Sequence, residues 1–325
     1  MKVVITGGSG FIGSTFVDFM LKKYPTLEII NLDNLSYAAL QGSNDFAEST
    51  GRYKHIYLDI VNANEVVDVF CRYMPTHIVH LAAESSVDAS LSHVTRHRFM
   101  ETNVLGTNNI FDAARICNTE PNILNMVTDE IFGSVLQGSS DEDYPWYSRN
   151  PYAASKAAAE CIANSYIESF GLNIKNLRCV NNFGPRQDGS KFIPKSIFRV
   201  LSGKPILLND KGQHVRSWIH VEQHCRAIDS VLMNGKPGLS YNVPSNEELS
   251  NLEMAKLILK TMNISESFYE FANLRQCDDL RYSISSKRIH ETGYIPEEKY
   301  LLKNSFNSVV KWYIDYAKKY PTVLM

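Results

Sequence analysis

The sequence lacks the features that would place it in a membrane, outside the cell or on nucleic acid. No stretch approaches the roughly 20 apolar residues needed to cross a bilayer. The chain starts with MKVVITGGSG, which has neither the basic start nor the apolar core of a signal peptide. The formal net charge is −2 and no basic or acidic block stands out. We therefore expect a cytoplasmic protein that binds no nucleic acid and no membrane.

Motifs for disulfides, metal binding and hydrolysis are also missing. The six cysteines are widely spaced without a CxxC pair, so we expect small buried residues in a reducing compartment. Two HxxxH pairs, His93 with His97 and His220 with His224, lack the glutamate of HExxH and a third ligand, and we expect no metal site. No GxSxG elbow is present, which disfavours a serine hydrolase.

What is present is an alternation of strand-like and helix-like segments through the first half of the chain. The expected strands are KVVIT, EIINLD, HIYLDI, THIVHLAAE, NILNMV and NIKNLRCV. Helices are expected near residues 11–24, 64–73, 98–118 and 152–170. This order predicts an α/β fold with a Rossmann-type, doubly wound parallel sheet.

A glycine-rich turn follows the first strand and precedes a helix. Gly8, Gly10 and Gly13 satisfy GxGxxG, and Gly7 places glycines at every third position. Such a turn lets the backbone approach a pyrophosphate, whose charge the helix N-terminus favours. Asp33 ends the second strand, where an acid can bind the adenosine ribose and repel a 2′-phosphate. The pattern predicts NAD as cofactor.

The stretch from Thr128 to Lys156 contains the residues best suited to catalysis. Asp129 and Glu130 follow a strand, so they should emerge at the same sheet edge as the glycine turn. Tyr152 and Lys156 are four residues apart on the next predicted helix and therefore share a face. A neighbouring ammonium favours the phenolate, so we expect the pKa of Tyr152 to be lowered and the tyrosine to accept protons.

The later part of the chain is predicted to form a smaller, substrate-binding lobe. We expect residues 1–180, rejoined by about 218–242, to form the NAD-binding domain, and residues 181–217 and 243–325 to form the lobe. Arg216, with Arg275 or Arg281, is a candidate ligand of a diphosphate. The alanine-rich helix 152–170 is apolar nearly all round, which predicts a homodimer through the helices near 98–118 and 152–170.

These motifs occur in an order that resembles one known family over nearly the whole chain. The segments are GGSGFIG, Asp33, HLAAESSVD, ETNVLGT, TDEIFG, YAASK and NNFGP. The chain resembles the extended short-chain dehydrogenase/reductase family. Within it the chain is most similar to the nucleoside-diphosphate-glucose 4,6-dehydratases, because Thr128, Asp129 and Glu130 form their signature triplet.

The resemblance implies a net dehydration with recycled NAD. Tyr152, assisted by Thr128, would take the proton of the sugar 4-hydroxyl while C4 loses hydride, and Lys156 would hold the nicotinamide ribose. The 4-keto group then acidifies the C5 proton, which Glu130 would remove while Asp129 protonates the departing C6 hydroxyl. Hydride returns to C6, and the product is a 4-keto-6-deoxy sugar.

The same resemblance implies binding positions around the catalytic group. The implied cofactor residues are Gly7, Gly10, Phe11, Ile12, Gly13, Asp33, Asp59, Ile60, Leu81, Ala82, Ala83, Thr102, Tyr152, Lys156 and Asn182. The implied substrate residues are Ser85, Thr128, Asn181, Lys191, Arg216, Asn242 and Arg275.

Departures from the family pattern bear on the nucleotide. RQCDDLRY stands where such dehydratases commonly have RPGHDRRY, and the loops near TDEIFG are shorter than in bacterial dTDP-glucose enzymes. The short loops are more similar to UDP-glucose dehydratases, so the expectation leans to UDP-glucose, with dTDP-glucose close behind. Two alternatives stay open: a 4-epimerase, in which the acid pair would be idle, and a non-catalytic NAD-sensing protein on the same scaffold.

Overall fold

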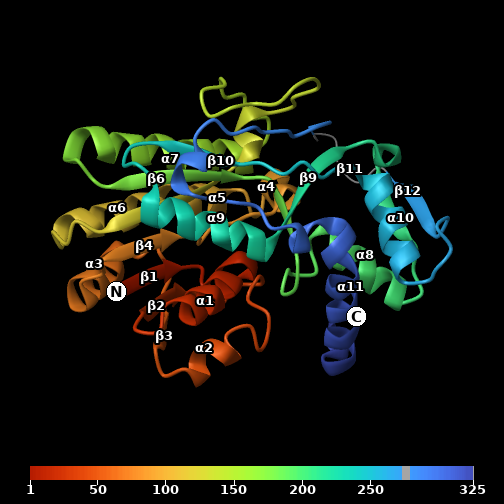
Figure 1. The fold of residues 1–325 in the computed structure, drawn as a ribbon, viewed down its shortest axis with the longest axis horizontal. Helices are drawn as coiled ribbons and strands as arrows, with labels where there is room; N and C mark the ends of the chain where they lie inside the picture. The colour runs from red at the N-terminus through yellow and green to blue at the C-terminus, as the bar shows by residue number, and fades with distance from the viewer. Residues whose placement is uncertain (273–278, 325) are drawn as a thin grey trace.

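The computed structural model describes residues 1–272 and 279–324, so Arg275 and Cys277 lie outside the described residues. A central sheet carries helices on both faces, and a smaller group of helices and short strands lies at one end (Figure 1). In the described part of the chain, no helix is both long enough and apolar enough to cross a bilayer.

The central sheet has seven strands, and every neighbouring pair is parallel. From one edge to the other they are β10 (Ser240–Val243), β6 (Ile174–Cys179), β5 (Asn122–Thr128), β4 (His77–His80), β1 (Lys2–Thr6), β2 (Glu28–Asp33) and β3 (Tyr53–Tyr57). The predicted α/β fold with a doubly wound parallel sheet is confirmed. All seven strands end at the same edge of the sheet, and this edge carries the site.

Two apolar layers explain why the strands are hydrophobic on both faces. Along β1, Val3 and Ile5 pack in the core that includes α1 (Phe11–Lys23) and α9 (Val221–Asn234). Val4 points to the opposite core, under the helices α3, α6 and α7. Those three helices span Ala63–Tyr73, Thr107–Ile116 and Pro151–Phe170.

The helix expected over residues 98–118 is interrupted. The chain forms α5 (His97–Met100), then one π-helical turn, η1 (Glu101–Gly106), and then α6. The π-turn places Asn103 where its side chain bonds the backbone of Glu84 and the hydroxyl of Ser155. A uniform 3.6-residue period could not reveal this local rewinding, which often marks functional sites.

The smaller lobe has its own core. Its strands are β7 (Asn181–Phe183), β9 (Val215–His220) and β11 (Glu248–Ser250) in one sheet, and β8 (Ile206–Asn209) with β12 (Tyr269–Ala272) in another. They pack with α8 (Phe192–Leu201), α10 (Asn251–Thr261) and α11 (Leu302–Lys319). The remaining elements are α2 (Asp45–Ser49), α4 (Val87–Leu91), η2 (Asp129–Phe132), η3 (Asp210–Gly212), η4 (Ile289–Thr292), η5 (Glu298–Tyr300) and η6 (Pro321–Leu324).

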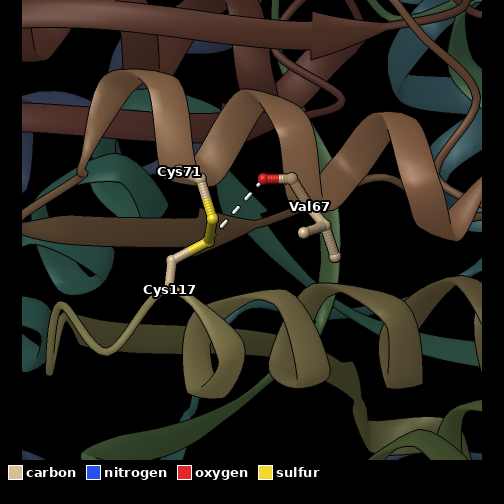
Figure 2. The surroundings of a disulfide bond; sticks show 3 residues. All are labelled: Val67, Cys71 and Cys117. Atoms are coloured by element: carbon tan, nitrogen blue, oxygen red, sulfur yellow. Dashed lines mark hydrogen bonds between the residues drawn. A yellow bond between two sulfur atoms is a disulfide. The ribbon is translucent and has the colours of Figure 1, made fainter.

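The expectation that the cysteines are reduced and buried is wrong for Cys71, Cys117 and Cys161. Cys71 of α3 and Cys117, just after α6, form a disulfide (Figure 2), and Cys161 is a free, exposed thiol. Wide spacing in sequence did not reveal the pair, because α3 and α6 become neighbours only when both cover the same face of the sheet. The Cys117 sulfur also lies 3.6 Å from the Val67 carbonyl oxygen, to which a reduced thiol could donate.

This disulfide should stabilise the fold, because it closes a sequence separation of 46 residues in the unfolded chain. We expect the Cys71→Ser, Cys117→Ser double variant to lose about 2–4 kcal/mol of unfolding free energy relative to the oxidised protein. Denaturant melts with and without reductant test this: reductant should destabilise the wild type but not the double variant. Cys161→Ser keeps the disulfide, so this control should respond to reductant as the wild type does. Identical melts of oxidised wild type and double variant would contradict the expectation.

Candidate active site

A cavity of about 320 Å³ opens at the carboxyl edge of the central sheet and reaches the smaller lobe. Every residue predicted to bind the cofactor lines it, from the glycine turn through Asp33 and the Leu81–Ala83 turn to Asn182. All five predicted catalytic residues line it as well. The sheet therefore brings together segments that are far apart in the sequence, as its topology predicts.

In the glycine turn the backbone lies so close to neighbouring backbone atoms that only glycine fits. Gly7 has φ +72°, and a Cβ there would lie 2.7 Å from the backbone nitrogen of Ala82. A Cβ at Gly13 would lie 2.0 Å from the carbonyl oxygen of Gly7. No larger side chain fits at either position without moving the backbone. The turn thus keeps backbone N–H groups open to the cavity at the start of α1, an arrangement that suits a pyrophosphate.

Asp33 closes the same turn. One of its carboxylate oxygens accepts a hydrogen bond from the backbone N–H of Ser9 (2.8 Å), and the other accepts from the N–H of Leu35 (2.8 Å). The carboxylate is buried at the end of β2 and lines the cavity. It lies where a ribose diol would be bound and a 2′-phosphate repelled.

Thr128, Asp129 and Glu130 leave the end of β5 in the η2 turn. The Thr128 hydroxyl accepts from the Glu130 N–H (3.4 Å) and donates to an Asp129 carboxylate oxygen (3.2 Å). The two acids meet different surroundings. Asp129 is buried, and its second oxygen has no hydrogen-bond partner among the described residues. Glu130 accepts hydrogen bonds from Asn150 (3.1 Å) and Tyr282 (3.2 Å).

These surroundings act differently on the two carboxyls. Burial, and then the charge of Glu130, raises the pKa of Asp129 to about 8, so this residue holds a proton near neutrality. Burial raises the pKa of Glu130 too, but its two hydrogen bonds and the charges of Arg216 and Lys191 oppose that shift. The pair can therefore supply an acid and a base at the same time.

The expected lowering of the Tyr152 pKa is wrong in this structure. Burial, together with the charges of Glu130 and Asp129, raises the pKa of Tyr152 well above its usual value. Burial lowers the pKa of Lys156 to about 8. The i, i+4 spacing correctly predicted one helical face, but it ignored two carboxyls that arrive from β5. Their repulsion and the loss of solvent disfavour the phenolate.

The predicted substrate residues divide into two groups. Ser85, Thr128, Asn181 and Lys191 line the cavity, and the Lys191 ammonium donates to the carbonyl oxygen of Ser85 (2.6 Å). Among the described residues, Arg216 and Asn242 do not line it.

The three arginines proposed for a diphosphate have different surroundings. The Arg216 guanidinium lies over the Tyr282 ring, 4.4 Å from its centroid. Arg281 pairs with both carboxylate oxygens of Glu248 (2.8 Å each), which disfavours it as a diphosphate ligand. Arg275 lies outside the described residues.

Sequence reasoning gave no role to Asn150, Tyr282 or Asn103. Asn150 caps α7, accepting from the Ala153 N–H (2.8 Å), while its amide donates to Glu130. An Asn directly before a proline is a helix-start signal, so the cap could have been found. No local pattern could have placed Tyr282 beside Glu130, which precedes it by 152 residues.

The raised pKa of Asp129 makes a prediction about stability. Between its ordinary value of 3.8 and about 8, the folded protein holds a proton that the unfolded chain releases. The free energy of unfolding should therefore fall as pH rises through this window. Asp129→Asn does not titrate, so its Tm relative to wild type should rise from pH 4 to pH 8. Asp315→Asn, at an exposed position, is the control. A Tm difference that does not change with pH would contradict this prediction.

Comparisons with known proteins agree on the family. Residues 4–299 match the family model described as GDP-mannose 4,6 dehydratase. The low-salt glycan biosynthesis protein Agl12 of Haloferax volcanii is 38% identical, with 97% of this chain and 99% of that protein aligned. A dTDP-glucose 4,6-dehydratase of Haemophilus influenzae is 32% identical over 97% of this chain and 98% of its own length.

A solved structure gives the same result. The dTDP-glucose 4,6-dehydratase DesIV of Streptomyces venezuelae, crystallised with NAD bound, superposes with a TM-score of 0.94. It is 34% identical and covers 99% of this chain and 100% of that one. The resemblance predicted from the motifs is confirmed: the chain belongs to the GDP-mannose 4,6 dehydratase family, within the extended short-chain dehydrogenase/reductases.

Proposed function

We propose that this protein is an NAD-dependent hydro-lyase that carries out the 4,6-dehydration of a nucleoside-diphosphate hexose. The observation that carries the proposal is the acid pair at the end of β5. One carboxyl is buried and protonated near neutrality, and the other is held by two hydrogen-bond donors. A 4-epimerase needs neither group, whereas an elimination needs both.

The glycine turn and Asp33 fit NAD, and Lys156 is placed to hold its nicotinamide ribose. When bound, oxidised NAD accepts hydride and brings a positive charge that favours the phenolate of Tyr152. In the first half-reaction Tyr152 takes the proton of the sugar 4-hydroxyl. Thr128, which interacts with the phenol and lowers its pKa, assists.

The second half-reaction is the elimination of water, which Asp129 and Glu130 carry out. Glu130 removes the C5 proton of the 4-keto sugar, and Asp129 protonates the C6 hydroxyl as it departs. Water leaves, and a C5–C6 double bond remains. The hydride taken from C4 would return from the reduced cofactor to C6 while Glu130 gives its proton back to C5, so the product is a 4-keto-6-deoxy sugar and NAD is regenerated. The assignment of Asp129 as acid and Glu130 as base agrees with their surroundings. One oxygen of Glu130 accepts hydrogen bonds from Asn150 and Tyr282, which favour its ionised form, whereas burial raises the pKa of Asp129 to about 8.

For the substrate we propose a nucleoside diphosphate of glucose held between the sheet edge and the smaller lobe, formed by residues 181–217 and 243–325. Ser85, Asn181 and Lys191 would contact it. The names of the relatives favour dTDP-glucose. The lean to UDP-glucose rested on the short loops near TDEIFG, and the departures in RQCDDLRY fall partly on residues 273–278, outside the described part of the chain. We therefore put dTDP-glucose first and UDP-glucose second.

One experiment tests activity and nucleotide together. The purified protein with NAD should convert dTDP-glucose, and more slowly UDP-glucose, to a product lighter by one water in the mass spectrum. Glu130→Gln should lower that rate by about 10²- to 10⁴-fold. It should also accumulate NADH, because oxidation at C4 still proceeds. An isomer of unchanged mass, formed equally by wild type and Glu130→Gln, would instead establish an epimerase. No sugar-dependent reaction in either protein would favour the non-catalytic alternative.

We also propose that two chains associate through the helices near 98–118 and 152–170. Apolar side chains are exposed there, with Met100 at 45%, Leu105 at 46% and Phe170 at 53%. Light scattering should give twice the chain mass of 36.8 kDa, and Leu105→Glu should reduce it to one chain, because a charge would be buried unpaired. Leu136→Glu, at an exposed site outside these helices, is the control. A single-chain mass for the wild type would contradict the dimer.

A further inference from the structure

Tyr282 is a buried residue whose hydroxyl reaches the proposed base from outside the cavity wall. It is 3% exposed, and its hydroxyl lies 3.2 Å from the nearer Glu130 carboxylate oxygen. Its backbone N–H donates to the Val215 carbonyl oxygen (3.4 Å), so its segment is joined to β9. Its ring also contacts the Arg216 guanidinium. The phenol is therefore held in place by the smaller lobe.

The same hydroxyl has a second carboxylate neighbour. It lies 2.8 Å from an Asp279 oxygen, and the other Asp279 oxygen accepts from Arg149 (3.1 Å). Asp279 is 2% exposed. A phenol carries one proton, so it cannot donate fully to Glu130 and Asp279 at once. Burial and the charge of Glu130 raise the pKa of Tyr282, which keeps that proton on the phenol.

The direction of these hydrogen bonds depends on whether Glu130 is charged. When Glu130 is ionised it can only accept, and the phenol can turn its proton toward it. When Glu130 holds a proton it can donate to the phenol oxygen, and the phenol donates to Asp279. Asn150 offers no such change, because its amide nitrogen only donates.

We infer that Tyr282 is a positioning residue for Glu130, with a hydroxyl that turns from Asp279 toward Glu130 when that carboxyl is ionised. The inference rests on the proposed function. In the elimination the C5 proton moves to Glu130, the C–H electron pair forms the C5–C6 double bond, and the C6 oxygen leaves as water with the proton of Asp129. Tyr282 transfers no proton. It stabilises the ionised base before the step and accepts a hydrogen bond after it.

Other titratable or charged groups also interact with Glu130. They are Asp129 in η2, Tyr152 on α7, Lys191 at the start of α8 and Arg216 on β9. Replacing the Tyr282 hydroxyl alone leaves all of them in place, which makes Tyr282→Phe the appropriate change.

Tyr282→Phe removes one hydrogen bond to an anion and keeps the ring against Arg216. The loss of such a bond destabilises the ionised carboxylate and should raise the pKa of Glu130 by about 1–2. The acid limb of the kcat–pH profile for dehydration should therefore move to higher pH by that amount. On the acid limb, at pH values below both pKa values, kcat should therefore fall about 10- to 100-fold while KM changes little, and NADH should accumulate there in single turnovers. Tyr294→Phe, a buried tyrosine bonded to Gln223, is the control and should keep the wild-type profile.

The outcomes of these experiments distinguish a failure of the positioning role from a failure of the proposed function. A wild type that dehydrates no sugar nucleotide overturns the proposed function and this inference with it. An active wild type with an unchanged acid limb in Tyr282→Phe overturns the positioning role alone. If Tyr282→Phe does not fold, the kcat–pH profile of Asp279→Asn tests the positioning role instead. It weakens the competing acceptor, so the acid limb should move to lower pH, and an unmoved limb would overturn the inference.

Discussion

A single buried guanidinium connects the parts of the site. Arg178, on β6 beside β5, donates to both carboxylate oxygens of Glu160 on α7 (2.9 and 2.5 Å) and to the Glu142 carbonyl oxygen (2.9 Å). Its guanidinium carbon lies 5.2 Å from the centroid of the Phe132 ring and 5.4 Å from that of the Trp146 ring. A buried charge costs several kcal/mol unless it is fully paired, so every partner must be in place. These partners include the helix that carries Tyr152 and the segment that follows the two acids.

This ion pair fixes two elements that local sequence cannot align. α7 must present Tyr152 and Lys156 toward the sheet edge, and η2 must present Asp129 and Glu130 to the same space. Because Phe132 closes η2 and also covers the guanidinium, a shift of either element would expose or unpair the buried charge. The geometry needed for catalysis is thus enforced by electrostatics in the core, below the cavity.

The sequence predicted what depends on local pattern and on sheet topology. The strand–glycine–helix start, Asp33, the acid pair and the face shared by Tyr152 and Lys156 all follow from spacing and from the rule that parallel strands end at one edge. The Cys71–Cys117 bridge, the π-turn at Asn103 and the contact of Tyr282 with Glu130 do not, because each depends on the packing of distant segments. The prediction that the pKa of Tyr152 is lowered was wrong for the same reason. It considered the Lys156 ammonium on the same helix, but not burial or the two carboxyls that follow β5.

The surroundings of the two acids also explain how one short turn can supply opposite proton states. Neighbouring carboxyls repel, so one proton is retained by the pair, and the environment decides where it resides. Asp129 has no donor on its second oxygen among the described residues, whereas Glu130 receives donors from two separate segments, the N-cap of α7 and the segment after residue 278. The proton is therefore favoured on Asp129. The smaller lobe, which supplies Tyr282 and Arg216, thereby participates in setting the acid and the base of a site whose other residues lie on the sheet.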